Sequence, residues 1–162
     1  LAEIQREKDR VVVTVGSAGA FGSGSARLTK QAKAIMQKIA KVSGKGAGQV
    51  NVSGHTDDVP LIFGGKYRDN WDLAAARASS VVQELSKANT IPMEKLKAIS
   101  FGETKPLEQN DSAKGRAKNR RIEIEIKYWY NKVLILSKIF RCLYGRRKKQ
   151  WKCWRLFNWS YS

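Results

Sequence analysis

An acidic residue and an arginine are spaced so that together they could hold a ligand carrying both charges. Asp57 follows an expected half-buried strand that ends at Gly54, while Asn70, Leu73 and Arg77 recur on one helical face. Long helical side chains lean toward the helix N-terminus, so Arg77 is expected to point toward the loop that carries Asp57. A ligand carboxylate would bind Arg77 and a ligand ammonium would pair with Asp57. The alternative is a structural Asp57–Arg77 salt bridge that ties loop to helix.

His55, Asp57 and Asp58 are the candidate metal ligands of this segment. On an extended segment only His55 and Asp57 would face the same side, and His55 is the single histidine of the chain. Zinc sites normally need three or four protein ligands, mostly nitrogen or sulfur. We therefore expect no metal.

Enzymatic motifs are missing from the sequence. No serine stands in a Gly-x-Ser-x-Gly turn, which hydrolases use to expose a nucleophile. The glycines from Gly16 to Gly24 do not form a nucleotide-binding Gly-x-Gly-x-x-Gly motif, because Arg27 occupies the last position. These observations favour binding over catalysis, and no cofactor is expected.

A second polar cluster lies just ahead of the last strand. Its donors are the arginines Arg116, Arg120 and Arg121 and the amide of Asn119. One interpretation is a solvated basic turn. The other is a cluster that satisfies loop carbonyls and lines the edge of a binding cleft.

Hydrophobic periodicity predicts the elements that position these residues. One helix begins at its N-cap Thr29 and ends at Gly44, and the clearest helix runs from Asn70 to about Lys87, with Asp69 and Asp72 at its start. The resulting order, β-α-β-α-β-β, predicts an α/β (α+β) sandwich with the helices on one face of a mixed four-stranded sheet. The predicted strands cover residues 11–15, 50–54, 97–101 and 121–126.

Composition divides the chain sharply near Lys127. The net charge is +17, but residues 128–162 hold nine basic residues and no acidic one, leaving 22 basic and 14 acidic residues elsewhere. That tail also holds both cysteines, Cys142 and Cys153. We expect a linker remnant at 1–9, one domain at 10–127 and a non-native or disordered tail at 128–162. A tail-driven binder of membrane surfaces or nucleic acid is the alternative.

Five ordered motifs together carry a resemblance to a known family. The chain resembles the OmpA-like peptidoglycan-binding domain over about residues 10–127, and most closely the C-terminal periplasmic region of the flagellar stator B subunit (MotB/PomB family). The opening segment 15–28 and the loop extending through Asp57-Asp58-Val59-Pro60-Leu61 to Trp71 favour the stator type. The motifs are Gly54-His-Thr-Asp-Asp58, Asn70-Trp-x-Leu73, Ala76-Arg-Ala78, Phe101-Gly-Glu-Thr-Lys-Pro106 and Gly115-Arg-Ala-Lys-Asn-Arg-Arg121.

The resemblance implies a ligand and the residues that bind it. Asp57 and Arg77 match the two positions that hold diaminopimelate of the cell-wall stem peptide. Thr56, Asn70, Leu73 and Arg121 match supporting positions of the same cleft.

The resemblance also implies partners and a location. Stator B subunits are non-enzymatic homodimers that bind peptidoglycan and associate with an A subunit through an N-terminal membrane helix. We therefore expect a periplasmic domain of a single-pass inner-membrane protein, with no nucleic-acid partner. Because Leu1 is not Met and no such helix is present in the sequence, a fragment or processed form is expected. A generic linker between outer membrane and cell wall is the alternative within the family.

Overall fold

The described part of the chain folds around one mixed five-stranded sheet. The computed structural model describes residues 2–7, 9–22, 24–61 and 65–128. The strands lie in the order β1-β2-β5-β3-β4, with β3 and β4 parallel and the other neighbours antiparallel. Their bounds are Ala2–Arg6 (β1), Arg10–Gly16 (β2), Ala47–His55 (β3), Leu96–Gly102 (β4) and Arg121–Tyr128 (β5).

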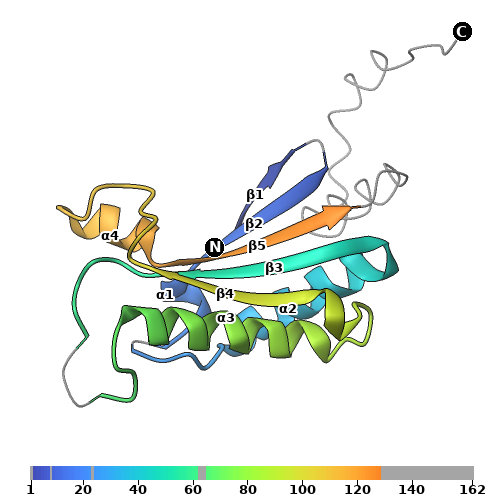
Figure 1. The fold of residues 1–162 in the computed structure, drawn as a ribbon, viewed down its shortest axis with the longest axis horizontal. Helices are drawn as coiled ribbons and strands as arrows, with labels where there is room; N and C mark the ends of the chain where they lie inside the picture. Colours follow the sequence, from blue (N-terminus) through green and yellow to red (C-terminus); the bar gives the residue numbers. More distant parts are fainter. Residues whose placement is uncertain (1, 8, 23, 62–64, 129–162) are drawn as a thin grey trace, which may run out of the picture.

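The two long helices cover one face of this sheet (Figure 1). Both begin as their sequences predict, because the side chain of Thr29 accepts from the Ala32 N–H and that of Asp69 accepts from the Asp72 N–H. Short helical turns join the other elements. The helices are α1 (Ser17–Ala20), α2 (Lys30–Ser43), η1 (Gly44–Gly46), α3 (Asn70–Ser86), η2 (Met93–Lys95) and α4 (Ala113–Asn119).

Alternation along the strands creates the core between sheet and helices. Val13, Val52 and Ile124 are buried side by side on adjacent strands, and Met36 and Leu85 meet them from α2 and α3. Each such side chain contributes about 1.5–3 kcal/mol by leaving water. The opposite face is more polar. There the register pairs Asn51 with Glu125, and the Asn51 amide donates to the Glu125 carboxylate at 2.7 Å.

The predicted fold class is confirmed, with two additions. The sheet has five strands, because Ala2–Arg6, expected to be part of a linker remnant at 1–9, pairs with β2. The segment expected to be turns before the last strand contains α4, which Ser112 caps by accepting from the Gly115 N–H. The predicted tail lies outside the described residues beyond Tyr128. No helix in the described part of the chain is long and apolar enough to cross a membrane.

Candidate functional site

The loop after β3 is held by backbone and amide contacts that place Asp57. The Thr56 N–H donates to the carbonyl of Gly102 at 2.9 Å, which ties the loop to the end of β4. The Asn70 amide donates to the carbonyls of Asp57 and Val59 at 3.3 and 3.2 Å. Asn70 is the first residue of α3, so the helix start and the loop are fastened together. The predicted residues Thr56, Asp57 and Asn70 are therefore neighbours.

The carboxylate of Asp57 is paired with Arg120. Arg120 Nη1 lies 2.5 Å from Asp57 Oδ2, and Asp57 is only 8% exposed. Within the described residues, no hydrogen bond or ion pair joins Asp57 to Arg77. The structural Asp57–Arg77 salt bridge considered from sequence is therefore not formed in this structure.

Arg77 is held separately, under the loop that follows α1. Its Nε donates to the Ser25 carbonyl at 3.0 Å, and its guanidinium carbon lies 5.2 Å from the centroid of the Phe21 ring. Arg77 is 5% exposed, and burial lowers its pKa. Tyr67 and Asp57 oppose that shift, while Arg120 adds to it. Asp57, Arg77 and Arg120 thus lie near enough to act on one another electrostatically.

The remaining predicted site residues are more deeply enclosed. Leu73 is buried, and so is the Thr56 hydroxyl, which has no hydrogen-bond partner in the described part of the protein. The Arg121 guanidinium donates hydrogen bonds to the Glu123 carboxylate and to the carbonyls of Asn119 and Lys105. A ligand contact for Arg121 stays a prediction. Its contacts within the protein hold the first residue of β5 in place.

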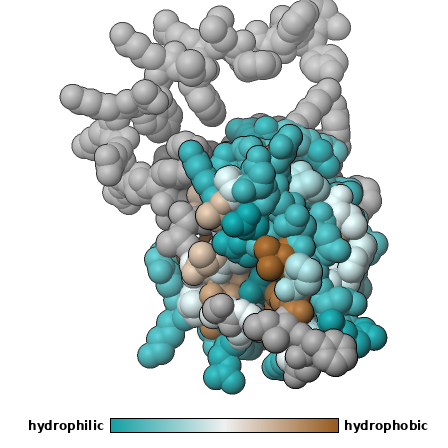
Figure 2. Space-filling model, turned by 90° about the vertical axis from the view of Figure 1, so that its left-hand side faces the viewer, coloured by the Kyte–Doolittle hydropathy of each residue, from teal (hydrophilic) through white to brown (hydrophobic). Residues whose placement is uncertain are grey.

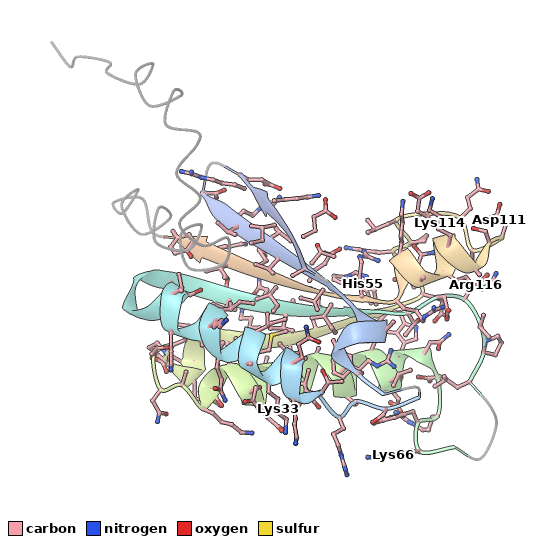
Figure 3. The ribbon with its side chains drawn as sticks, turned by 180° about the vertical axis from the view of Figure 1, so that it is seen from behind. Lys33, His55, Lys66, Asp111, Lys114 and Arg116 are labelled. Carbon is pink, nitrogen blue, oxygen red and sulfur yellow. The ribbon has the colours of Figure 1, made fainter. Side chains whose placement is uncertain are left out.

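The basic segment satisfies loop carbonyls, as its sharper interpretation predicts. Asn119 is fully buried; its oxygen accepts from the Leu107 and Glu108 N–H groups, and its amide donates to the Glu108 carbonyl. Arg116 donates to the Asn110 carbonyl at 2.6 Å. Figure 3 shows Arg116 on α4, at the same end of the molecule as His55. By holding Asn119, this network also positions the next residue, Arg120.

His55 is a buried neutral base at the end of β3. It is 2% exposed, stacks on Phe101 at 5.2 Å between centroids, and its Nε2 lies 3.7 Å from Glu123 Oε2. Burial, with the charges of Arg121 and Lys105, lowers the pKa of His55 to about 4 despite Glu123. Among the described residues, no group of three or more His, Cys, Asp or Glu could hold a metal ion.

An open groove of about 530 Å³ adjoins Arg77 on the outer side of α3. Ser25, whose carbonyl accepts from Arg77, forms part of its wall. Polar and basic side chains dominate the groove lining, which comprises Ser25, Ala26, Arg27, Lys66, Tyr67, Ala76, Ser79, Ser80 and Gln83.

The end of the molecule that carries α4 and the Asp57 loop is predominantly hydrophilic, with a few hydrophobic residues near its centre (Figure 2).

Comparison with known proteins identifies the family. The OmpA family profile matches residues 20–120, which is more than half of the chain. This protein belongs to the OmpA family. The family is a non-enzymatic peptidoglycan-binding family, so the expectation that the chain is not an enzyme is confirmed.

Three proteins to which the chain is similar illustrate the range. The uncharacterised protein YtxE of Bacillus subtilis is 33% identical over 123 residues, covering 76% of this chain and 50% of YtxE. The cell wall anchor of the T6SS from Pseudomonas aeruginosa is 35% identical with a TM-score of 0.71, covering 79% of this chain and 88% of that one. The periplasmic domain of Helicobacter pylori MotB is 26% identical with a TM-score of 0.69, covering 89% and 92%. The chain spans about half the length of its curated relative YtxE.

Two features of the site were not predicted from the sequence. Arg120 was noted as part of a basic cluster, but nothing in the sequence paired it with Asp57, which lies 63 residues earlier. The groove beside Arg77 gives no sequence signal at all, because its walls come from three separated segments.

Proposed function

We propose that this domain binds peptidoglycan without catalysing a reaction, by holding the ammonium and carboxylate of a diaminopimelate side chain. Asp57 supports the ammonium contact, because its carboxylate lies in a largely enclosed position that already attracts a cation. Arg77 supports the carboxylate contact, because it is anchored through Nε while its terminal nitrogens make no hydrogen bond to any described residue. The single observation that carries the proposal is that these two charges influence one another while each is held by a different partner, Asp57 by Arg120 and Arg77 by the Ser25 carbonyl.

A binding assay with isolated cell walls tests this function. The wild-type protein is expected to sediment with peptidoglycan sacculi, and Asp57→Ala and Arg77→Ala are each expected to remove most of that binding. Lys118→Ala is the matched control, since Lys118 is an exposed cation paired with Glu108 away from the loop. Circular dichroism would show that the variants remain folded. Retained binding in both site variants would refute the proposal.

We further propose that the parent protein is a flagellar stator B subunit. In that role it is a homodimer in the periplasm, carried by one inner-membrane helix and partnered by a stator A subunit. The likeness to the Helicobacter pylori MotB periplasmic domain supports this role. Co-purification of the full-length protein with an A subunit, and loss of motility on its deletion, are the expected results.

A second candidate is a cell-wall linker outside the flagellar motor. The similarity to the T6SS cell wall anchor, with higher sequence identity, favours this alternative. Sacculus binding with unchanged motility after deletion would support it. A protein ending at Tyr128 tests the tail-driven alternative, because sacculus binding should persist while any steeply salt-dependent binding to nucleic acid is lost.

A further inference from the structure

We propose that Arg120 is a resident cation, which holds the ammonium position beside Asp57 and moves, when a ligand ammonium enters, to bind a second carboxylate of the ligand. This inference rests on the proposed function and adds a preference to it. The preferred ligand carries one ammonium and two carboxylates, as a wall peptide does when a free C-terminus lies next to its diaminopimelate.

The contacts of Arg120 suit a group that can be displaced. Its side chain is 37% exposed, and the contact to Asp57 is its only side-chain hydrogen bond to the described residues. Arg121, the next residue, is 4% exposed at its side chain and makes three contacts. The backbone beneath Arg120 is nevertheless fixed, because its carbonyl accepts from the Ser17 N–H and its own N–H donates to Arg116. The guanidinium of Arg120 is therefore partly exposed and singly bonded, whereas the backbone that carries it is held by two hydrogen bonds.

The charges of the protein groups at the site define which charged groups a preferred ligand must carry. The protein contributes one carboxylate, Asp57, and two guanidinium groups, Arg77 and Arg120, and the charge of Arg120 disfavours that of Arg77. A ligand ammonium that takes over Asp57 releases Arg120 close to Arg77. One carboxylate can then neutralise Arg77, and a second is needed to neutralise Arg120. A bare amine supplies neither and leaves two cations unpaired.

Three synthetic probes with one ammonium each and different numbers of carboxylates test this preference, and the first two differ in a single carboxylate. N-acetyl-diaminopimelyl-D-alanine has one ammonium and two carboxylates, its D-alaninamide has one carboxylate, and N-acetylcadaverine has none. For the wild type we expect the acid to bind at least about tenfold more tightly than the amide, as for one charge-assisted contact. In Arg120→Gln that ratio should fall toward one, while N-acetylcadaverine should bind more tightly than it does to the wild type.

Controls separate this effect from a general change in charge or stability. Lys118→Gln removes the same charge two residues away, on an exposed ion pair with Glu108, and should leave the acid-to-amide ratio unchanged. Arg120→Lys keeps the charge and should retain a larger ratio than Arg120→Gln. Adding the acid to the wild type should also shift the ¹⁵N resonance of Arg120 Nε.

The outcomes distinguish this inference from the function on which it rests. If the wild type binds neither sacculi nor any probe, both proposals fail. If Asp57→Ala and Arg77→Ala abolish binding but Arg120→Gln leaves the ratio unchanged, only the resident-cation proposal is overturned. It is also overturned if all three probes weaken equally in Arg120→Gln, or if the Arg120 resonance does not respond to the acid.

Discussion

A Cβ atom on Gly54 would lie 2.2 Å from the backbone oxygen of Ala74. Such a contact does not exist in real proteins, so only glycine allows the end of β3 to approach α3 this closely. The approach fixes the site, because Asp57 follows β3 by two residues and Arg77 lies one helical turn beyond Ala74. The separation of Asp57 and Arg77 thus depends on Gly54, which has no side chain to contact a ligand.

Gly54→Ala is expected to destabilise the fold and weaken wall binding together. The backbone must shift to admit the methyl group, at a cost of about 1–3 kcal/mol for overpacking. Urea unfolding measures the loss. Gly16→Ala is the matched control, since a Cβ there meets nothing within 4 Å. Equal stability of the two variants would contradict the role assigned to Gly54.

Asn70→Ala should loosen the Asp57 loop more than it destabilises the domain. The variant loses the two amide contacts to the carbonyls of Asp57 and Val59. Since a net hydrogen bond contributes about 1 kcal/mol, we expect a modest fall in stability and roughly tenfold weaker sacculus binding. Hydrogen exchange should accelerate at residues 57–59. Unchanged exchange there would show that Asn70 does not hold the loop.

The regular elements could be predicted because their signals are local. The Thr29 cap and the Gly44 end of α2 were both expected, and the alternation Ile122, Ile124, Ile126 marks β5 by itself. The first strand carries no such pattern: Ile4 is its only large apolar residue, and its pairing with Val13 in β2 is what makes it a strand. Helix α4 is equally hidden, because its stability comes from the loop it packs on.

The site was predicted in its parts but not in its pairing. Asp57, Asn70 and Arg77 could be placed near one another, because a strand end and a helix start must meet in this topology. The partner of Asp57 depends on how β5 brings Arg120 back across the sheet, which is a long-range property of the fold. The spacing along the chain offers Arg77 as a possible salt-bridge partner of Asp57. In the structure, Arg77 instead lies over the Phe21 ring and donates to the Ser25 carbonyl.

Asn119→Ala should unfold the loop before α4. Asn119 is fully buried. Its side-chain oxygen accepts from the N–H groups of Leu107 and Glu108, and its amide donates to the Glu108 carbonyl. Leaving such groups unsatisfied costs about 1–3 kcal/mol each, so we expect a loss of about 3 kcal/mol or more. Amide exchange at Leu107 and Glu108 should rise strongly. Lys97→Ala, at an exposed residue of β4 that takes no part in this network, should change neither measurement.

His55 makes the stability of the domain fall as the pH drops below neutrality. Its pKa is about 4 in the folded protein against 6.5 for an ordinary histidine, so the unfolded chain binds the proton more readily. The stabilising contribution is complete above pH 6.5 and is lost progressively as the pH falls toward 4. Between pH 7.5 and pH 5 the shift amounts to about 2 kcal/mol.

His55→Phe isolates that contribution, because phenylalanine can keep the stacking on Phe101 but cannot be protonated. Free energies of unfolding for the two proteins, measured at pH 5 and pH 7.5, should differ in their pH dependence by about 2 kcal/mol, with the variant the less sensitive. Both proteins keep Glu123, Arg121 and Lys105 beside position 55, so the difference between the two pH profiles reports the histidine. Parallel pH profiles would mean that His55 takes up its proton as easily in the folded protein as in the unfolded chain.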